Sequence, residues 1–491
     1  MLQHLAPQPL WQHFQQICAI PHPSYHEEAL VSHLQRFADQ QGLQHQRDKV
    51  GNLIIRKPAT AGLEHAAGVV LQSHMDMVPQ KSDDSNHDFS VDPIRPRVVD
   101  GWVFATDTTL GADNGIGVAA MLAVLQATDL EHGPLEALFT INEESGMDGA
   151  KGLQAGILKG ELLLNLDSEQ EGELYVGCAG GIDATAKIAM QRSPLSDERV
   201  GLKLIVRGLQ GGHSGLDINL GRGNANQLLA ELIQQLSSQY DLKLVDFNGG
   251  SLRNAIARRA DALLAVSADQ LAALRDSTQQ LKAELKQRYH QTEPELDVGF
   301  LHTDIDADPL TAASQQQLID AVLNCPHGMQ RMHPSLEGVV ETSNNLAKVQ
   351  LKDTSVELQC LARSANELER DQLCQQIESR LAPLGATVTF DGAYPGWTPD
   401  LNAPLLDAMQ RLHQQLFDQA AEVKVIHAGL ECGLLAAAYP NWQMISFGPT
   451  IRFPHSPGEK VEIASVERFW QYLSHCLKKL AKLHEQAKGP Q

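Results

Sequence analysis

Five short stretches of the sequence are rich in residues that can bind metal ions, and most of them follow an apolar run. The stretches QSHMDM, GADNGIG, INEESG, LNLDSE and FPHSPGE contain His74, Asp76, Asp113, Glu143, Glu144, Asp167 and His455. Two imidazoles and several carboxylates suit a pair of catalytic, zinc-like ions. If folding brings these stretches together, they predict a hydrolytic site with two metal ions.

Apolar runs, partly β-branched, stand in front of four of the stretches and read as buried strands. They lie at residues 68–73 before His74, 135–141 before Glu143, 162–166 before Asp167, and 443–447 before the loop of His455. Strands that alternate with helical patterns indicate a parallel sheet, whose ligands gather outside the carboxyl ends of the strands. We therefore expect these four stretches to converge at one sheet edge.

The fifth stretch places Asp113 after Gly111, at the start of an apolar helical run at residues 116–125. A carboxylate is favoured at a helix amino terminus, so Asp113 taken alone could be a helix cap. The adjacent Glu143 and Glu144 could likewise be a solvated turn. Because they follow an apolar strand, however, their charges would be partly desolvated unless a cation compensated them.

The amino-terminal segment predicts two helices. Leu10, Phe14 and Ile17 share one helical face. Ser24 and Glu27 have the spacing of a capping box for a second helix that follows Ser24. Two nearby histidines at positions 22 and 26 flank Pro23 and this cap, which favours a turn over a metal site.

The order HxD, ADN, EE, D and a late H resembles the M20 family of co-catalytic metallopeptidases. The sequences SHMDMV, LGADNGIG, NEESGMDGA, LNLDSE, GGHSG and PGWTPD are more specifically similar to its bacterial aminoacyl-histidine dipeptidase branch, the cytosolic non-specific dipeptidases. The resemblance extends from about His22 to about Glu462, and no expected ligand position departs from the pattern.

The resemblance implies a role for each residue of the five stretches. Asp113 would bridge two divalent ions, and two residue pairs would complete their shells: His74 with Asp167, and Glu144 with His455. Glu143 would be the general base, and Asp76 would orient His74. Asp167 stands where related carboxypeptidases and deacylases carry Glu, which favours a dipeptidase. Mixed imidazole and carboxylate ligands suit zinc, with manganese or cobalt as alternatives.

The chain has 491 residues, too many for one core, and its pattern changes at about Gly181. Residues 181–396 contain strand and helix patterns, but none of these strands ends in acidic residues of the kind that would bind a metal. His455, a candidate ligand, lies beyond this segment. We therefore expect an α/β fold with a discontinuous catalytic domain (residues 1–180 and 397–491), built on a mostly parallel central sheet with helices on both faces. The resemblance implies that the α+β insertion is a lid and dimerisation domain.

Four residues outside the metal-ligand stretches receive roles from the resemblance only. His213, in GGHSG, is more simply explained by a hairpin when its local sequence is taken alone. The resemblance implies that it reaches across a homodimer to stabilise the oxyanion. Asn254 and Arg363 would hold the carboxylate of the substrate, for which an Arg fork is well suited. Gly429 would leave backbone room for the substrate's carboxy-terminal side.

Composition limits the partners and the location of the protein. The formal charge of −21 argues against nucleic acid and anionic membranes as partners. Seven scattered cysteines without a CxxC pair are typical of reduced thiols in a cytoplasmic protein. We see neither a signal sequence at the amino terminus nor an apolar run of membrane-spanning length.

The sequence thus predicts a metallodipeptidase that cleaves unblocked dipeptides, including Xaa-His and β-alanyl-His. One alternative is an M20 deacylase or tripeptidase acting on N-acyl amino acids or short peptides. Another is a non-catalytic binding protein on the same fold, which we would expect to lack Glu143 or a ligand. This chain lacks none of them.

Overall fold

The chain folds as two units, each built around its own sheet and apolar core. The computed structural model describes residues 2–487. The first unit comprises Met1–Gly177, Pro399–Val425 and Leu430–Gln491, and the second comprises Cys178–Thr398 and Ile426–Gly429. The segment expected as an insertion, residues 181–396, lies within the second unit. No described helix has both the length and the apolar character needed to cross a membrane.

Eight strands form the main sheet of the first unit, in the order β1-β2-β6-β3-β7-β19-β8-β18. The four central strands run parallel to one another: β6 (Leu135–Thr140), β3 (Val69–His74), β7 (Leu162–Asn165) and β19 (Gln443–Ser446). Antiparallel pairs join β1 (Gln44–Arg47) to β2 (Leu53–Lys57), β2 to β6, and β8 (Glu173–Cys178) to β19. The last strand is β18 (Glu422–Ile426). The expected parallel arrangement is therefore confirmed for the central strands, while the pairings outside them that join β1, β2 and β8 are antiparallel.

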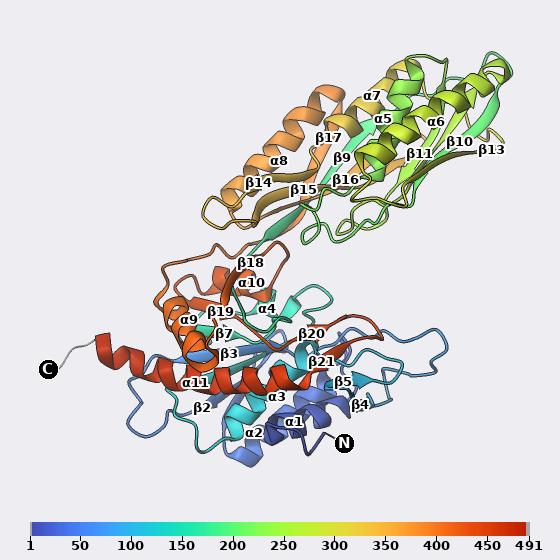
Figure 1. Cartoon of the computed structure of the whole chain (residues 1–491). Coiled ribbons are helices and arrows are strands. Elements are labelled where there is room, and N and C mark those ends of the chain that lie inside the picture. Colours follow the sequence, from blue (N-terminus) through green and yellow to red (C-terminus); the bar gives the residue numbers. More distant parts are fainter. Residues whose placement is uncertain (1, 488–491) are drawn as a thin grey trace. The chain divides into compact units, whose positions relative to one another are not determined.

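Helices cover both faces of this sheet, so β3, β6 and β7 are buried along their whole length. Alternate residues such as Leu71, Phe139 and Leu164 join one large apolar core. That core also contains side chains from α1 (Gln8–Cys18), α2 (Glu28–Gln41), α3 (Ala112–Gln126), α9 (Pro404–Phe417) and α11 (Ile463–Ala487). Figure 1 shows α4 (Asp148–Gly152) and α10 (Glu431–Ala438) on the other side of the sheet from α3 and α11.

The amino-terminal helices form, but the predicted capping box does not. Leu10, Phe14 and Ile17 are buried on one face of α1, as expected. The second helix, α2, starts only at Glu28 and has no side-chain cap. Ser24 Oγ instead donates a hydrogen bond to Asp76 Oδ2 at 2.7 Å, and Glu27 Oε1 accepts one from the backbone N–H of Asn142 at 3.0 Å. The capping prediction was wrong because both side chains hold distant loops of the same unit.

A small four-stranded sheet in the first unit presents the loop of His455. Its order is β20 (Ile451–Arg452), β21 (Lys460–Glu462), β5 (Trp102–Ala105) and β4 (Pro96–Val99). Strands β20 and β21 form an antiparallel pair, and the loop between them carries both His455 and Glu459. His455 adopts a left-handed backbone conformation, with φ 57°.

The second unit is an antiparallel sheet covered by helices. Its strand order is β13-β10-β12-β11-β15-β16-β9-β17, with β14 beside β15, and every pairing recorded for it is antiparallel. The strands are β9 (Gly180–Ala189), β10 (Val200–Arg207), β11 (Lys243–Gly249), β12 (Ala260–Val266), β13 (Asp297–Thr303), β14 (Gly328–Met332), β15 (Val340–Leu351), β16 (Ser355–Ser364) and β17 (Ala386–Tyr394). One apolar core joins the sheet to α5 (Ala225–Ser237), α6 (Leu271–Arg288), α7 (Ala312–Asn324) and α8 (Glu367–Leu381). This unit therefore has the α+β character expected of the insertion.

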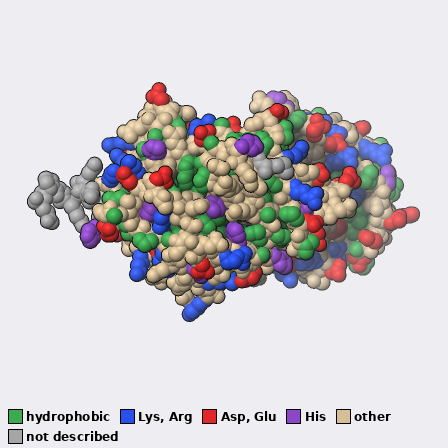
Figure 2. Space-filling model, turned by 90° about the horizontal axis from the view of Figure 1, so that it is seen from below, with side chains coloured by type: hydrophobic (Ala, Val, Ile, Leu, Met, Phe, Trp, Pro, Cys, Tyr) green, Lys and Arg blue, Asp and Glu red, His purple; other side chains and the backbone are tan. Residues whose placement is uncertain are grey.

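The surface shown in Figure 2 carries charged side chains of both signs. Lys and Arg are interspersed with Asp and Glu on this face, and hydrophobic side chains lie among them. The acidic side chains therefore do not gather into a single patch on this face.

Candidate metal centre

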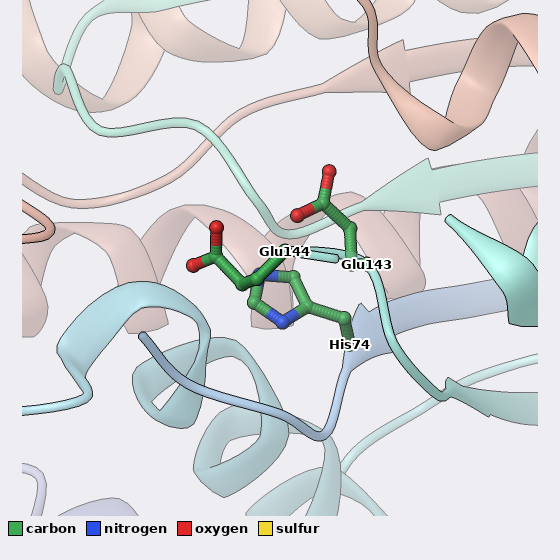
Figure 3. Close-up of side chains that lie close together, drawn as sticks. All are labelled: His74, Glu143 and Glu144. Atoms are coloured by element: carbon green, nitrogen blue, oxygen red, sulfur yellow. The ribbon is translucent and has the colours of Figure 1, made fainter. Parts of the chain in front are cut away.

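The predicted ligand residues of the first unit meet at the carboxyl ends of its parallel strands. His74 is the last residue of β3, Glu143 and Glu144 follow β6, and Asp167 follows β7. Figure 3 shows the carboxylates of Glu143 and Glu144 diverging from one turn, with the His74 ring beside Glu144. Three of the four stretches expected at this sheet edge therefore converge there, whereas His455 lies in the loop between β20 and β21 of the small sheet.

Asp113 lies between the two imidazoles. Its Oδ1 is 3.1 Å from His74 Nε2, and its Oδ2 is 3.2 Å from His455 Nε2. His74 Nε2 also lies 3.3 Å from Asp167 Oδ1, and His455 Nε2 lies 3.1 Å from Glu144 Oε1. Two groups of potential ligand atoms, each within 4.8 Å of one another, therefore share Asp113: one with His74 and Asp167, the other with Glu144 and His455.

The donor set fits divalent cations. His74 Nδ1 lies 2.9 Å from the backbone carbonyl of Asp76, which assigns the proton of a neutral ring to Nδ1 and the lone pair to Nε2. That lone pair would face carboxylate oxygens of Asp113 and Asp167 and repel them without a cation between them. Within the described residues, the buried Asp167 Oδ1 and Glu144 Oε1 accept no hydrogen bond. A cation would satisfy all of these atoms at once.

Burial and crowding shift the titration of this cluster. Burial raises the pKa of Glu143 well above its usual range and that of Asp167 to about 6, and neighbouring carboxylates add to both shifts. Burial also acts to raise the pKa of Asp113, but contacts with His455 and His74 bring it below its ordinary value. Asp113 and Glu144 raise the pKa of His455 to about 11. A cluster of buried groups with such strongly shifted pKa values is typical of a functional site.

Asp76 connects His74 to the turn that carries the two glutamates. Its Oδ1 accepts a hydrogen bond from the backbone N–H of Glu143 at 2.9 Å, and its Oδ2 accepts one from Glu144 at 3.2 Å. Ser24 Oγ donates a third hydrogen bond to the Asp76 carboxylate. Asp76 Oδ1 also lies 3.4 Å from His74 Nδ1. One buried carboxylate thus holds three segments of the site.

The Glu143 carboxylate forms no hydrogen bond or ion pair with the described residues. One of its oxygens nevertheless lies within 4.8 Å of ligand atoms of His74 and Glu144. Its neighbour Glu144 faces His455, whereas Glu143 lies outside both groups that share Asp113. Glu143 is therefore free to exchange a proton beside the ligand groups.

The four residues with roles taken from the resemblance lie in the second unit. His213 Nδ1 accepts hydrogen bonds from the backbone N–H groups of Gly215 at 3.2 Å and Leu216 at 3.0 Å. Burial, with a contribution from the charge of Arg363, lowers the pKa of His213 to about 4. The ring is consequently neutral near pH 7 and carries its proton on Nε2, where it can donate a hydrogen bond.

Ser214, which follows His213 in the chain, forms hydrogen bonds with two of the other residues, Arg363 and Asn254. Arg363 Nε donates to Ser214 Oγ at 3.2 Å, and the backbone N–H of Ser214 donates to the Asn254 carbonyl at 2.8 Å. Arg363 Nη1 also donates to Tyr394 Oη at 2.6 Å, a contact that the sequence did not predict. Gly429 belongs to Ile426–Gly429, a segment of the second unit that packs against Gly215 through the carbonyl of His427.

Three further carboxylates near the ligand groups received no role from the sequence. Glu431 is buried and accepts hydrogen bonds from Gln72 Nε2 at 2.6 Å and Thr140 Oγ1 at 2.7 Å, and burial raises its pKa to about 8. Glu169 is partly buried two residues after Asp167, and burial raises its pKa to about 8. The third, Glu459, is described below. A signal for Glu431 was present, since it is an acidic residue in the otherwise apolar run around LECGLL.

Residues 70–479 match the family model described as peptidase family M20/M25/M40. The chain belongs to this family. It is a metallopeptidase of the M20/M25/M40 type, and all five predicted ligands lie within the matched residues. The resemblance seen in the ordered motifs is confirmed.

Similar proteins match nearly the whole chain. The cytosol non-specific dipeptidase of Escherichia coli (strain K12) is 46% identical over 479 residues, which cover 98% of this chain and 99% of the relative. The crystal structure of aminoacylhistidine dipeptidase from Vibrio alginolyticus is also 46% identical, with a TM-score of 0.89 over 97% of this chain and 98% of its own. A tripeptidase from Staphylococcus aureus, 18% identical with a TM-score of 0.56 over 97% and 99% of the two chains, shares the fold.

Proposed function

We propose that this chain is a dipeptidase with two divalent metal ions, which hydrolyses dipeptides that have a free amino terminus, including Xaa-His and β-alanyl-His. The observation that carries the proposal is the sharing of Asp113 by two ligand groups. The names of the relatives from Escherichia coli and Vibrio alginolyticus support the substrate class, because each matches this chain at 46% identity over nearly its full length.

The proposed metal ligands are divided about Asp113. His74 and Asp167 would hold one ion, and Glu144 and His455 would hold the other, with Asp113 common to both groups of potential ligands. Zinc suits this mixture of imidazole and carboxylate donors, and manganese and cobalt are the alternatives to be compared with it. When bound, the ions polarise the scissile carbonyl and lower the pKa of a water molecule.

Glu143 is the proposed general base. Its carboxylate takes a proton from the attacking water and later delivers that proton to the leaving amine, so one residue serves both steps. The absence of hydrogen-bond partners among the described residues leaves both carboxylate oxygens available for this transfer. Asp76 holds the backbone N–H of Glu143 and thereby orients the base relative to His74.

The second unit is proposed to act as the lid and dimerisation domain, spanning about residues 181–396. The N–H of His213 Nε2 donates a hydrogen bond to the oxyanion that develops on the substrate carbonyl of the partner subunit's site. Arg363 and Asn254 hold the carboxylate of the substrate, and Gly429 leaves room beside it. The neutral Nε2–H form of His213 supports this role, because that form can donate without titrating near pH 7. A cytoplasmic location is proposed from the name of the Escherichia coli relative.

Elemental analysis of the purified protein combined with a substrate panel tests the proposal. We expect about two divalent ions per chain and cleavage of Gly-His and β-alanyl-His, with little cleavage of N-acetyl-Gly-His. A preference for N-acetyl amino acids or for Gly-Gly-His would favour the deacylase or tripeptidase alternative. A metal-loaded protein that cleaves none of these compounds would support the non-catalytic alternative.

A further inference from the structure

Glu459 is a buried carboxylate that holds the backbone in front of α3. Its exposed fraction is 2%, and it accepts hydrogen bonds from four consecutive backbone N–H groups. Oε2 accepts from Leu110 at 2.7 Å and Gly111 at 3.1 Å, and Oε1 accepts from Ala112 at 2.7 Å and Asp113 at 3.3 Å.

These four N–H groups need an acceptor from outside their own segment. The first N–H groups of a helix lack intrahelical partners, and α3 begins at Ala112. Within the helix start, Asp113 departs from helical geometry with φ −83° and ψ 107°, and Gly111 has φ 70°. A charged carboxylate is a strong acceptor for such donors and is favoured by the helix dipole at this end.

The Glu459 side chain connects the β20–β21 loop to the segment that carries Asp113, and these two segments meet at the group formed by Asp113, Glu144 and His455. Glu459 lies in the loop between β20 and β21, four residues after His455. Asp113 is at once a donor to Glu459, through its backbone N–H, and the neighbour of His455 Nε2, through Oδ2 at 3.2 Å. The placement of Asp113 relative to both imidazoles therefore depends on where Glu459 holds the backbone.

We infer that Glu459 is a positioning residue of the metal centre, which sets the Asp113 carboxylate between the two ligand groups by holding four backbone N–H groups. The inference rests on the proposed two-metal function. Glu459 is not itself a ligand, because both of its oxygens are engaged by N–H donors and it belongs to neither described group that shares Asp113. It acts through Asp113.

The matched control is Glu136, a buried carboxylate at the opposite end of the sheet. Glu136 is 6% exposed, stands second in β6, and accepts hydrogen bonds from the backbone N–H groups of Lys159 at 2.6 Å and Gly160 at 2.9 Å. It also pairs with Arg56. Replacing it removes a buried carboxylate of the same unit without touching the segment that carries Asp113.

The test compares zinc binding by the wild-type protein, Glu459→Gln and Glu136→Gln in competition with a chromophoric zinc chelator. A glutamine has one acceptor oxygen, and its amide group would face two N–H donors. We expect Glu459→Gln to bind zinc about 10- to 100-fold more weakly, as is typical when an outer partner of a metal ligand is lost. Glu136→Gln should bind zinc as the wild type does. At saturating zinc, kcat of Glu459→Gln should return toward the wild-type value.

Folded Glu459→Gln that binds zinc as tightly as the wild type would overturn the inference. If this variant does not fold, Glu459→Asp provides the test: it keeps the charge but is one methylene shorter and cannot reach all four N–H groups. Wild-type zinc affinity in folded Glu459→Asp would also overturn the inference. A wild-type protein that binds no divalent ion would instead refute the proposed function, so the two failures are distinguishable.

Discussion

His74 Nδ1 lies 2.9 Å from the backbone carbonyl of Asp76, whereas the Asp76 carboxylate is 3.4 Å from the same nitrogen. The backbone carbonyl therefore sets the tautomer of His74. This contact does not depend on which side chain stands at position 76. The Asp76 carboxylate is left to accept the N–H groups of Glu143 and Glu144. A single residue thus orients a proposed ligand through its backbone and the proposed base through its side chain.

Glu143→Gln should retain both metal ions and lose turnover. The amide keeps the shape of the side chain but cannot accept a proton, and proton transfer typically supplies about 10²- to 10⁴-fold in rate. Metal content should not change, because Glu143 lies outside both groups that share Asp113. The measurements are kcat on Gly-His and elemental analysis, with the exposed Glu161→Gln as control. Substantial turnover by the metal-loaded Glu143→Gln protein would remove Glu143 from this role.

Asp113→Ala and His455→Ala should differ in the number of ions lost. Asp113 belongs to both ligand groups, whereas His455 belongs to one. We expect Asp113→Ala to lower the content of both ions and His455→Ala to deplete chiefly one, as measured by elemental analysis after equal dialysis. Equal losses in the two variants would contradict the assignment of Asp113 as the shared ligand.

His213→Ala should lower turnover about a hundredfold or more, because an oxyanion donor contributes about 2.7 to 4 kcal/mol in the transition state. The metal content should be unchanged, since His213 is not a proposed ligand. Mixing this inactive variant with inactive Glu143→Ala tests whether His213 acts between subunits. Heterodimers should regain one working site, formed by the intact Glu143 of one subunit and the intact His213 of the other. Verified heterodimers that stay as inactive as both parents would exclude action across the interface.

His327 should make the stability of the second unit sensitive to acid. Burial lowers the pKa of His327 to about 4, and its Nδ1 accepts the backbone N–H of Leu346 at 3.2 Å. The unfolded chain, with a pKa near 6.5, binds the proton first. The free energy of unfolding should therefore fall as the pH drops from about 6.5 toward 4, by about 3 kcal/mol for the full shift.

Denaturant unfolding at pH 7 and pH 4.5 measures this effect. His327→Gln keeps an acceptor for Leu346 and should show a smaller loss of stability between the two pH values. The control is His302→Gln, at an exposed position on β13. An equal loss in wild type and His327→Gln would show that His327 does not contribute to the acid sensitivity.

Part of the site was predictable because several of its residues stand at the ends of buried parallel strands. Such strands are recognisable as short apolar runs, and the carboxyl ends of parallel neighbours lie at one sheet edge. His74, Glu143 and Asp167 could therefore be assigned to that edge from their local sequences. The outer strands could not be oriented in this way, because antiparallel pairing of β1, β2 and β8 depends on partners far along the chain.

The sequence by itself determined which residues are available for metal chemistry and which strands carry them, because residue type and periodicity are local properties. Only the tertiary structure decided how they are held. Ser24 contacts Asp76 instead of capping α2, and Glu459 holds the backbone of Asp113 from the loop after β20. Both contacts join segments far apart in sequence, and their partners depend on burial and on the direction of each side chain. No local pattern encodes those quantities, so the supporting contacts of the site became visible only in the folded chain.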